Sequence, residues 1–167
     1  MVQCALIHPQ RFYVKFLLLS FFFFFSSILF ADRVEITSTS MKAENLKKEV
    51  HFIGNAKVKK GADWLHADTV IVYFDDHNQT NKYEAIGNVT FELYNDKNNY
   101  LGEAQKVTYH PLTLIYVLEG KSVIDDIANK RHVHGNTIHL NMKTGDVNVK
   151  GSQKKPVKFI FDTEDKK

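Results

Sequence analysis

The chain has 167 residues and a formal net charge of +3, with 22 Lys and Arg residues against 19 Asp and Glu residues. This length suggests one domain, and so small a net charge gives no electrostatic case for binding nucleic acid. The single cysteine, Cys4, lies ahead of the first apolar run, so the rest of the chain has neither a disulfide nor a thiolate metal site.

Residues 1–31 are typical of a secretory signal peptide. Arg11 and Lys15 precede an apolar run over residues 16–30, and Ala31 follows it. A basic start, about 7–15 apolar residues and a small residue at the end describe such a peptide, and the run is shorter than the roughly 20 residues that cross a bilayer. We therefore expect cleavage near residue 31 and export to a bacterial periplasm, where disulfides are allowed but not required. An uncleaved N-terminal anchor is the alternative.

From Val34 onward, apolar residues mostly alternate with other residues. They occupy most of the alternate positions over residues 50–58 and 85–93, and a period of two marks strands with one buried face. The stretches between the apolar runs are rich in turn-forming residues and cover positions 75–78, 95–99 and 143–146. The best helical candidate, residues 41–50, shows only loose spacing, and we interpret it as a turn between two strands. The sequence therefore predicts an all-β fold.

The predicted strands repeat along the chain. Glycines at positions 54, 87, 120 and 151 recur at a spacing of about 33 residues. The segments that align around the first three glycines are residues 50–58 (VHFIGNAKV), 83–91 (YEAIGNVTF) and 116–124 (YVLEGKSVI), with a weaker copy at 147–151. The second halves of the units are residues 67–72, 104–109 and 135–140. Glycine inside a strand marks a bulge or a bend, so one bend per repeat would curl the sheet into a roll of units that pack on their neighbours.

A family resemblance rests on these repeats. The string Val50-His-Phe-Ile-Gly-Asn-Ala-Lys-Val58, followed by Leu65-His-Ala-Asp-Thr-Val70-Ile-Val72, resembles the OstA-like repeat of the lipopolysaccharide transport proteins LptA, LptC and the periplasmic part of LptD. The opening Val34-Glu-Ile36-Thr-Ser, with Ala43-Glu44, is similar to the start of a mature LptA chain.

The resemblance covers about residues 33–151, although Lys121 replaces the asparagine that the first two copies carry at positions 55 and 88. It implies a twisted, slightly open β-jellyroll, that is, a rolled antiparallel sheet of OstA-like repeats. We place this jellyroll domain at residues 32–152, after the signal peptide at 1–31, and a charged C-terminal segment at 153–167.

An apolar inner face of such a roll could shield a lipid from water. Burying one methylene group is worth about 0.8 kcal/mol, so one long acyl chain gains on the order of 10 kcal/mol. The sugar head must stay wet, and the roll should therefore be slit or open-ended. The candidate lipid-binding residues on the inner face are Val34, Ile36, Val50, Phe52, Ala56, Val58, Val70, Val72, Val89, Phe91, Val107, Leu118, Ile138 and Leu140. We expect Phe52, Phe91 and Leu118 to point into the lipid path; an ordinary dry core is the alternative.

Signals for catalysis or metal binding are weak. His132 and His134 share one face of a predicted strand and His139 is nearby, but zinc needs three or four convergent ligands, so we interpret them as polar residues facing water. The chain has no nucleophile elbow and no phosphate-binding loop. Trp64 precedes a strand, and we favour a core position over one at the groove mouth. We therefore expect no catalytic residue, no metal and no cofactor.

The resemblance also implies partners. Lipopolysaccharide would be the cargo, an LptC-like inner-membrane protein would bind the N-terminal end, and an LptD-like outer-membrane protein would bind the C-terminal end. The first and last predicted strands, residues 34–38 and 147–151, contain no proline, and unblocked edges accept further strands. Head-to-tail self-association is therefore expected unless the charged tail caps the C-terminal end.

Two other functions remain open at this point. One is an inner-membrane-anchored relative, similar to LptC, in which residues 16–30 stay as an anchor. The other is a structural β-repeat scaffold module without lipid cargo.

Overall fold

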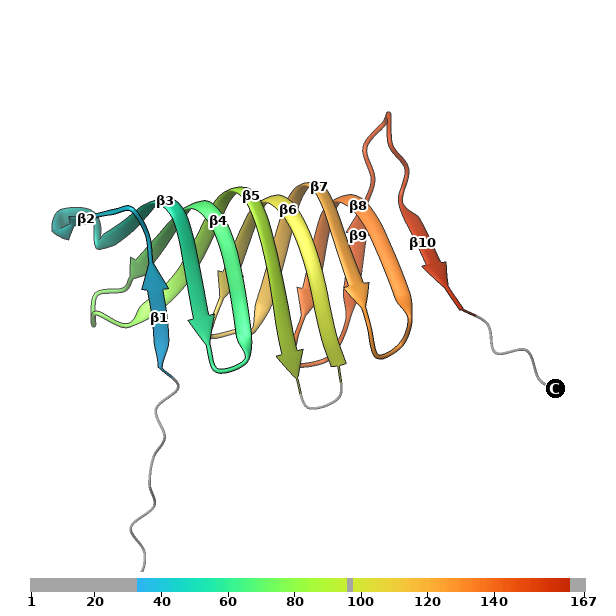
Figure 1. Ribbon diagram of the computed structural model, residues 1–167, viewed down its shortest axis with the longest axis horizontal. Coiled ribbons are helices and arrows are strands. Elements are labelled where there is room, and N and C mark those ends of the chain that lie inside the picture. The colour runs from blue at the N-terminus through green and yellow to red at the C-terminus, as the bar shows by residue number, and fades with distance from the viewer. Residues whose placement is uncertain (1–32, 96–97, 163–167) are drawn as a thin grey trace, which may run out of the picture. The chain divides into compact units, whose positions relative to one another are not determined.

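The computed structural model describes residues 33–95 and 98–162 (Figure 1). The predicted signal peptide and the alternative anchor at 16–30 lie outside the described residues. The strands are β1 (Val34–Thr37), β2 (Ser40–Glu44), β3 (Glu49–Lys60), β4 (Asp63–Phe74), β5 (Thr80–Asn95), β6 (Asn98–His110), β7 (Ile115–Asp126), β8 (Arg131–Asn141), β9 (Val147–Lys150) and β10 (Lys158–Phe161). They form one open antiparallel sheet in the order β1-β3-β4-β5-β6-β7-β8-β10, with β2 also on β3 and β9 also on β8. The predicted all-β jellyroll is confirmed, and no helix within these residues could span a membrane.

The sheet bends at the repeated glycines. Three residue steps on β3, from Ile53 to Ala56, lie opposite two steps on β4, from Thr69 to Ala67, so β3 contains a bulge. The same shift occurs in β5 and β7, and we call these three the bulged strands. The two bulge residues have positive φ in every case: Gly54 (84°) and Asn55 (48°), Gly87 (82°) and Asn88 (47°), and Gly120 (79°) and Lys121 (53°). The predicted bend at each of the first three glycines is therefore present.

The bends divide the sheet into two walls that face each other. Wall 1 consists of β1, β10 and residues 56–67, 89–95, 98–104 and 122–135. Wall 2 consists of β2, β9 and residues 49–53, 69–86, 106–119 and 137–141. Figure 1 shows the bends along the top of the sheet and wall 1 toward the viewer. We call the side opposite the bends the seam.

Glycine is needed at the bend for space as well as for backbone conformation. A Cβ built on Gly87 would lie 2.9 Å from Cβ of Asp68, on the strand before it, and Gly120 meets Gln105 at the same distance. Thr39, between β1 and β2, fills the same place beside Gly54. Asn88 also binds this neighbour, because its Nδ2 donates a hydrogen bond to Oδ2 of Asp68 (2.9 Å). At each bend, one polar residue from the neighbouring earlier segment (Thr39, Asp68 or Gln105) thus occupies the space left by the missing side chain of glycine.

Two local expectations need correction. Residues 41–50 are not a single turn, because β2 continues to Glu44 and pairs with β3, which leaves a short 3-10 turn at Asn45–Lys47 and Lys48 between them. The sheet also extends beyond residue 152, since Lys158–Phe161 form β10 on β8. The predicted turns at 75–78 and 143–146 lie between strands, whereas β5 continues to Asn95 and β6 begins at Asn98.

The core lies between the walls. It comprises Ala56, Ala67, Val70, Val72, Ala85, Val89, Phe91, Leu93, Tyr100, Ala104, Val107, Leu118, Ile124, Val133, Ile138 and Leu140. Because each strand contributes inward residues on both sides of its bend, one sheet supplies both faces of this core.

Lys121 is the bend residue least suited to its backbone. A left-handed conformation costs an L-residue roughly 1–2 kcal/mol, and asparagine tolerates it best after glycine. We expect Lys121→Asn to raise the free energy of unfolding by about 0.5–1 kcal/mol and the reverse change, Asn88→Lys, to lower it by at least as much. Urea denaturation of the two variants measures both effects. A Lys121→Asn protein no more stable than the parent would contradict this account of the bend.

Candidate functional site

All fourteen predicted lipid-binding residues lie on the inner faces of the walls, as their strand registers show. Those that are fully buried are Ala56, Val70, Val72, Val89, Phe91, Val107, Leu118, Ile138 and Leu140. Ile36, Val50, Phe52 and Val58 are partly buried, and Val34 is exposed at the N-terminal edge. The structure thus places the predicted residues on one continuous apolar surface.

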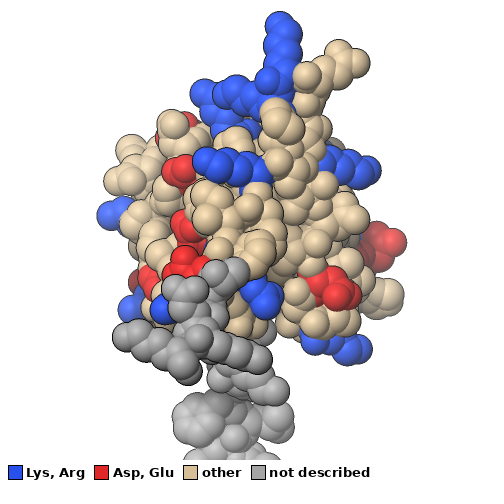
Figure 2. Space-filling view, turned by 90° about the vertical axis from the view of Figure 1, so that its right-hand side faces the viewer, with Lys and Arg blue, Asp and Glu red and all other residues tan. Residues whose placement is uncertain are grey.

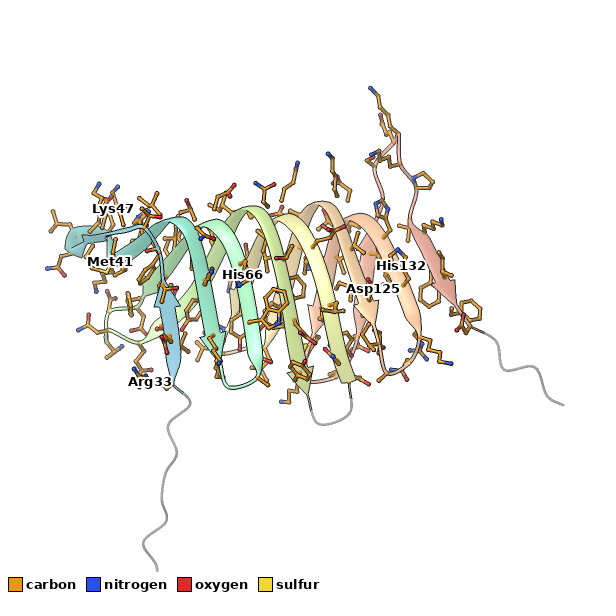
Figure 3. The ribbon with its side chains drawn as sticks, in the orientation of Figure 1. Arg33, Met41, Lys47, His66, Asp125 and His132 are labelled. Atoms are coloured by element: carbon orange, nitrogen blue, oxygen red, sulfur yellow. The ribbon has the colours of Figure 1, made fainter. Side chains whose placement is uncertain are left out.

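A cavity of about 140 Å³ opens between the walls near the seam. The apolar residues that line it are Val34, Val58, Leu65 and Leu93 from wall 1, and Val70, Tyr83, Ala85, Val107, Tyr109, Pro111 and Tyr116 from the side of wall 2. Lys60, Asp63 and Glu84 add charged groups, and Trp64 also belongs to the lining. Of the predicted residues, Val34, Val58, Val70 and Val107 therefore line open space. Figure 3 shows how side chains of both walls otherwise fill the interior.

Phe91 and Leu118 pack as core residues in this structure. Their exposed fractions are 1% and 0%, and the ring of Phe91 occupies the space that a Cβ on Gly102 would need. Phe52 is only partly buried, against the same core. An Asp at Phe91 or Leu118 would bury a charge and report on folding, so the residues that line the cavity are the better probes of ligand binding.

Three tyrosines form a stack along wall 2. Tyr83, Tyr109 and Tyr116 are cross-strand neighbours on β5, β6 and β7. The ring centroids of Tyr83 and Tyr109 are 6.0 Å apart, and those of Tyr109 and Tyr116 are 4.3 Å apart. Burial raises the pKa of the Tyr116 and Tyr109 hydroxyls above the ordinary tyrosine value. The sequence pattern does not predict this stack, although Tyr83 and Tyr116 begin the second and third repeats.

Trp64 lies on the outer face of wall 1, so its predicted core position is wrong. Its inward neighbour is Leu65, and the strand alternation turns Trp64 outward. The indole Nε1 donates a hydrogen bond to Oε2 of Glu92 (2.7 Å). Tyr94 and Asn99 donate to Oε1 of the same carboxylate, and these bonds, that from Tyr94 first, lower the pKa of Glu92. Trp64 thus ties strands together on the outside of the roll.

The histidines do not form a metal centre in the part of the chain that the structure describes. His132 pairs across strands with Asp125, with 2.5 Å between Nδ1 and Oδ1. Both residues are labelled in Figure 3. His134 is partly buried and His139 is exposed on the same strand. Residues 33–95 and 98–162 contain no group of three or more His, Cys, Asp or Glu side chains that could hold a metal ion.

The inner apolar face remains uncovered at both edges of the sheet. Met41 is 63% exposed at the N-terminal edge, opposite Phe52 on β3. At the C-terminal edge, Phe159 and Phe161 are 53% and 55% exposed, and their rings stack at 5.4 Å. Figure 2 looks at this end and shows a central strip without Lys, Arg, Asp or Glu below a group of Lys and Arg side chains, with Asp and Glu side chains on either side of the strip. The apolar surface therefore continues from the core to both ends.

Comparison with known proteins gives one family and one fold. Residues 35–146 match the family model described as "LptA/(LptD N-terminal domain) LPS transport protein". The crystal structure of LptH, the LptA homologous periplasmic component of the lipopolysaccharide transport device of Pseudomonas aeruginosa, superposes with a TM-score of 0.69. It shares 14% sequence identity, and the match covers 79% of this chain and 96% of that one, which supports a common fold. No curated protein sequence matches the chain.

The partly buried Tyr109 and Tyr116 should make stability depend on pH in alkaline solution. A raised pKa in the folded state stabilises the fold fully below the unfolded value of about 10, and this stabilisation is lost as the pH rises toward the folded value. Tyr116→Phe removes one such group. Near pH 8, the difference in unfolding free energy between this variant and the parent should not change with pH. Above about pH 10, the unfolding free energy of the variant should rise relative to that of the parent by up to about 1.4 kcal/mol per pH unit. Parallel curves from urea titrations across this range would contradict the assignment.

Proposed function

We propose that this chain, which belongs to the LptA/(LptD N-terminal domain) family of lipopolysaccharide transport proteins, shields the acyl chains of lipopolysaccharide between its two walls. The observation that carries the proposal is the apolar cavity between the walls, which lies on the inner face that reaches both edges. The family's description is that of a transport protein, and we assign no catalytic step to any residue.

The size of the cavity sets a condition on binding. Ligand sites usually occupy about 300–1,000 Å³, which is larger than the 140 Å³ between the walls. An acyl chain would therefore enter at the seam and separate the walls further. Lys60 and Asp63 are charged residues in the lining of the cavity. A polar head could therefore stay near them and near water while the acyl chain contacts Val58, Leu65 and Tyr83.

We place this activity in the periplasm, after removal of residues 1–31. The LptH structure is described as that of a periplasmic component, which supports the location. An LptC-like relative anchored through residues 16–30 is the alternative, and the size and membrane association of the cellular product distinguish the two. A scaffold module without cargo is the other alternative, and the lipid test below excludes or favours it.

The edges supply the second part of the proposal, a bridge between membranes. An LptC-like protein would join the N-terminal edge and an LptD-like protein the C-terminal edge, with further copies able to join head to tail. The strand pattern supports this arrangement, because β1 with β2 corresponds to an unbulged strand and β9 with β10 to a bulged one. A head-to-tail joint between two copies would therefore continue the alternation of bulged and unbulged strands.

The repeats also set the register of such a joint. Counted from the bends, Phe159 corresponds to Val58, whose neighbour on β4 is Leu65. Leu65 corresponds in turn to Ile36, three residues before the bend residue Thr39. Phe159 would therefore lie opposite Ile36 of the next copy, and the inner apolar face would run through the joint.

Photo-crosslinking from neighbouring residues tests the lipid path. A benzophenone amino acid at Val58 or Tyr83, which line the cavity, should form adducts with lipopolysaccharide in cells. The matched controls are Lys57 and Lys82, each one residue away on the outer face. We expect inward positions to label at least about tenfold more strongly, because acyl chains avoid the wetted face. Equal labelling from both faces, or none, would reject the path and favour a scaffold.

Cysteine pairs test the register of the joint. In a Cys4→Ser background, a chain with Ile36→Cys and Phe159→Cys should form a ladder of disulfide-linked oligomers on mild oxidation, since directly opposite residues have Cβ atoms about 4.5–5.5 Å apart. The control pairs Phe159→Cys with Glu35→Cys, whose side chain leaves the opposite face of β1. A ladder that the control reproduces, or the absence of any ladder, would contradict the register.

A further inference from the structure

β9 and β10 are two parts of one strand that an insertion separates. Residues Thr137 and His134 of β8 pair with Glu119 and Val123 of β7, four steps apart. On the other side of β8 the same two residues pair with Lys150 and Lys158, eight steps apart. The fourth repeat therefore contains four additional residues at its bend.

These residues form a closed loop at the bend. The backbone N–H of Ser152 donates to the carbonyl of Lys155 (2.8 Å), and the N–H of Lys155 donates back to Ser152 (3.2 Å). Figure 1 shows the segment between β9 and β10 rising above the line of the other bends. We call residues 152–157 the insertion loop. It stands beside the backbone edge that a joining strand would use.

The insertion loop is basic. Lys154 and Lys155 lie within it, and Lys150 and Lys158 flank it, all four exposed. None of the four forms an ion pair with another residue in the described ranges. Figure 2 shows Lys and Arg side chains projecting at the top of this end. A strand that joins here would approach positive charge that no carboxylate among the described residues neutralises.

The chain's own N-terminal edge does not complement this charge. Its acidic residue on β2, Glu44, already binds Lys42 (2.8 Å) and Lys47 (2.6 Å), and these hydrogen bonds lower the pKa of Glu44 to about 2. The bend of that edge carries only the uncharged residues 38–40, and Lys57 lies opposite Thr37 on the adjoining strand. Glu35 lies farther from the bend and could reach only Lys158 in the register given above.

We propose that the insertion loop selects the strand partner of the C-terminal edge: it favours the edge of a different protein whose bend carries carboxylates, and it weakens docking of a second copy. The inference rests on the proposed end-to-end function and names the chemistry of the partner. Complementary charges at the rim of an interface act on partner choice and are screened by salt. Selection by the loop should therefore be strongest at low ionic strength.

The probe for this proposal is the chain itself with an acidic N-terminal bend. Thr37→Glu with Ser40→Glu places two carboxylates on the outer face on either side of the bend. At about 50 mM salt we expect sedimentation to show self-association tightened by about tenfold, and the gain should disappear near 500 mM salt. In the register given above, positions 37 and 40 lie opposite Lys158 and Lys150. The gain should therefore fall when Lys154→Ala and Lys155→Ala are added, and disappear when Lys150→Ala and Lys158→Ala are added as well. His77→Glu with Gln79→Glu, in the turn between β4 and β5, is the control for net charge.

A deletion tests the second half of the proposal. Removing residues 153–156 joins Ser152 to Val157 and restores the four steps between Lys150 and Lys158. We expect this chain to self-associate several-fold more tightly than the parent without an added carboxylate. Lipopolysaccharide crosslinking from Val58 should be unchanged, which shows that the protein is folded and separates this test from the lipid proposal.

The outcomes distinguish the two proposals. If the control pair tightens association as much as the acidic bend does, or if the lysine substitutions leave the gain intact, selection by the insertion loop is wrong and end-to-end joining stands. If the deletion does not tighten self-association, the loop does not weaken docking of a second copy. If no variant associates at any concentration, end-to-end joining of copies fails together with the selection that rests on it.

Discussion

A two-residue bulge at positive φ is the constraint on which the rest of the structure depends. An antiparallel sheet with one apolar face must cover that face, and this sheet does so by folding over itself at Gly54, Gly87 and Gly120. The extra residue of each bulge keeps the inward alternation in phase through β3, β5 and β7. The strands without a bulge change phase instead, so Ala67 and Val70 are both buried although they lie three residues apart. The two walls, the cavity and the seam all follow from this bend.

The pattern of the sequence already contained most of this architecture. The alternation of apolar residues predicted the strands. The spacing of the glycines predicted the first three bends, because a bulge at positive φ favours glycine and asparagine, and these residue types are visible in the sequence. The aligned second halves of the repeats start at Ala67, Ala104 and Gly135, which the structure shows to be the last inward residues before the phase change. Lys121 adopts the bend conformation without the favoured residue type because the strands on both sides hold it there.

Other features could not be predicted, for physical reasons that differ. Trp64 is amphipathic, and hydrophobicity alone does not distinguish an inward ring from an outward one that bonds to Glu92. The tyrosine stack joins three strands, so it depends on registers that a single sequence does not specify. The repeat spacing does not predict β10, because the insertion displaces this strand and no later strand within the described residues covers its apolar side chains.

The alternation of bulged and unbulged strands also gives the sheet a direction. The N-terminal edge is of the unbulged kind and the C-terminal edge of the bulged kind, so two identical edges set side by side would interrupt the pattern. The repeats between the edges resemble one another in sequence and in their bends. In the proposed function, the direction of transport would therefore come from the partner that each edge admits. The C-terminal edge is aromatic and lies beside four lysines that form no ion pair within the described residues. At the N-terminal edge Glu44 is already bound and Glu35 lies away from the bend, so the two edges are different enough to admit different partners.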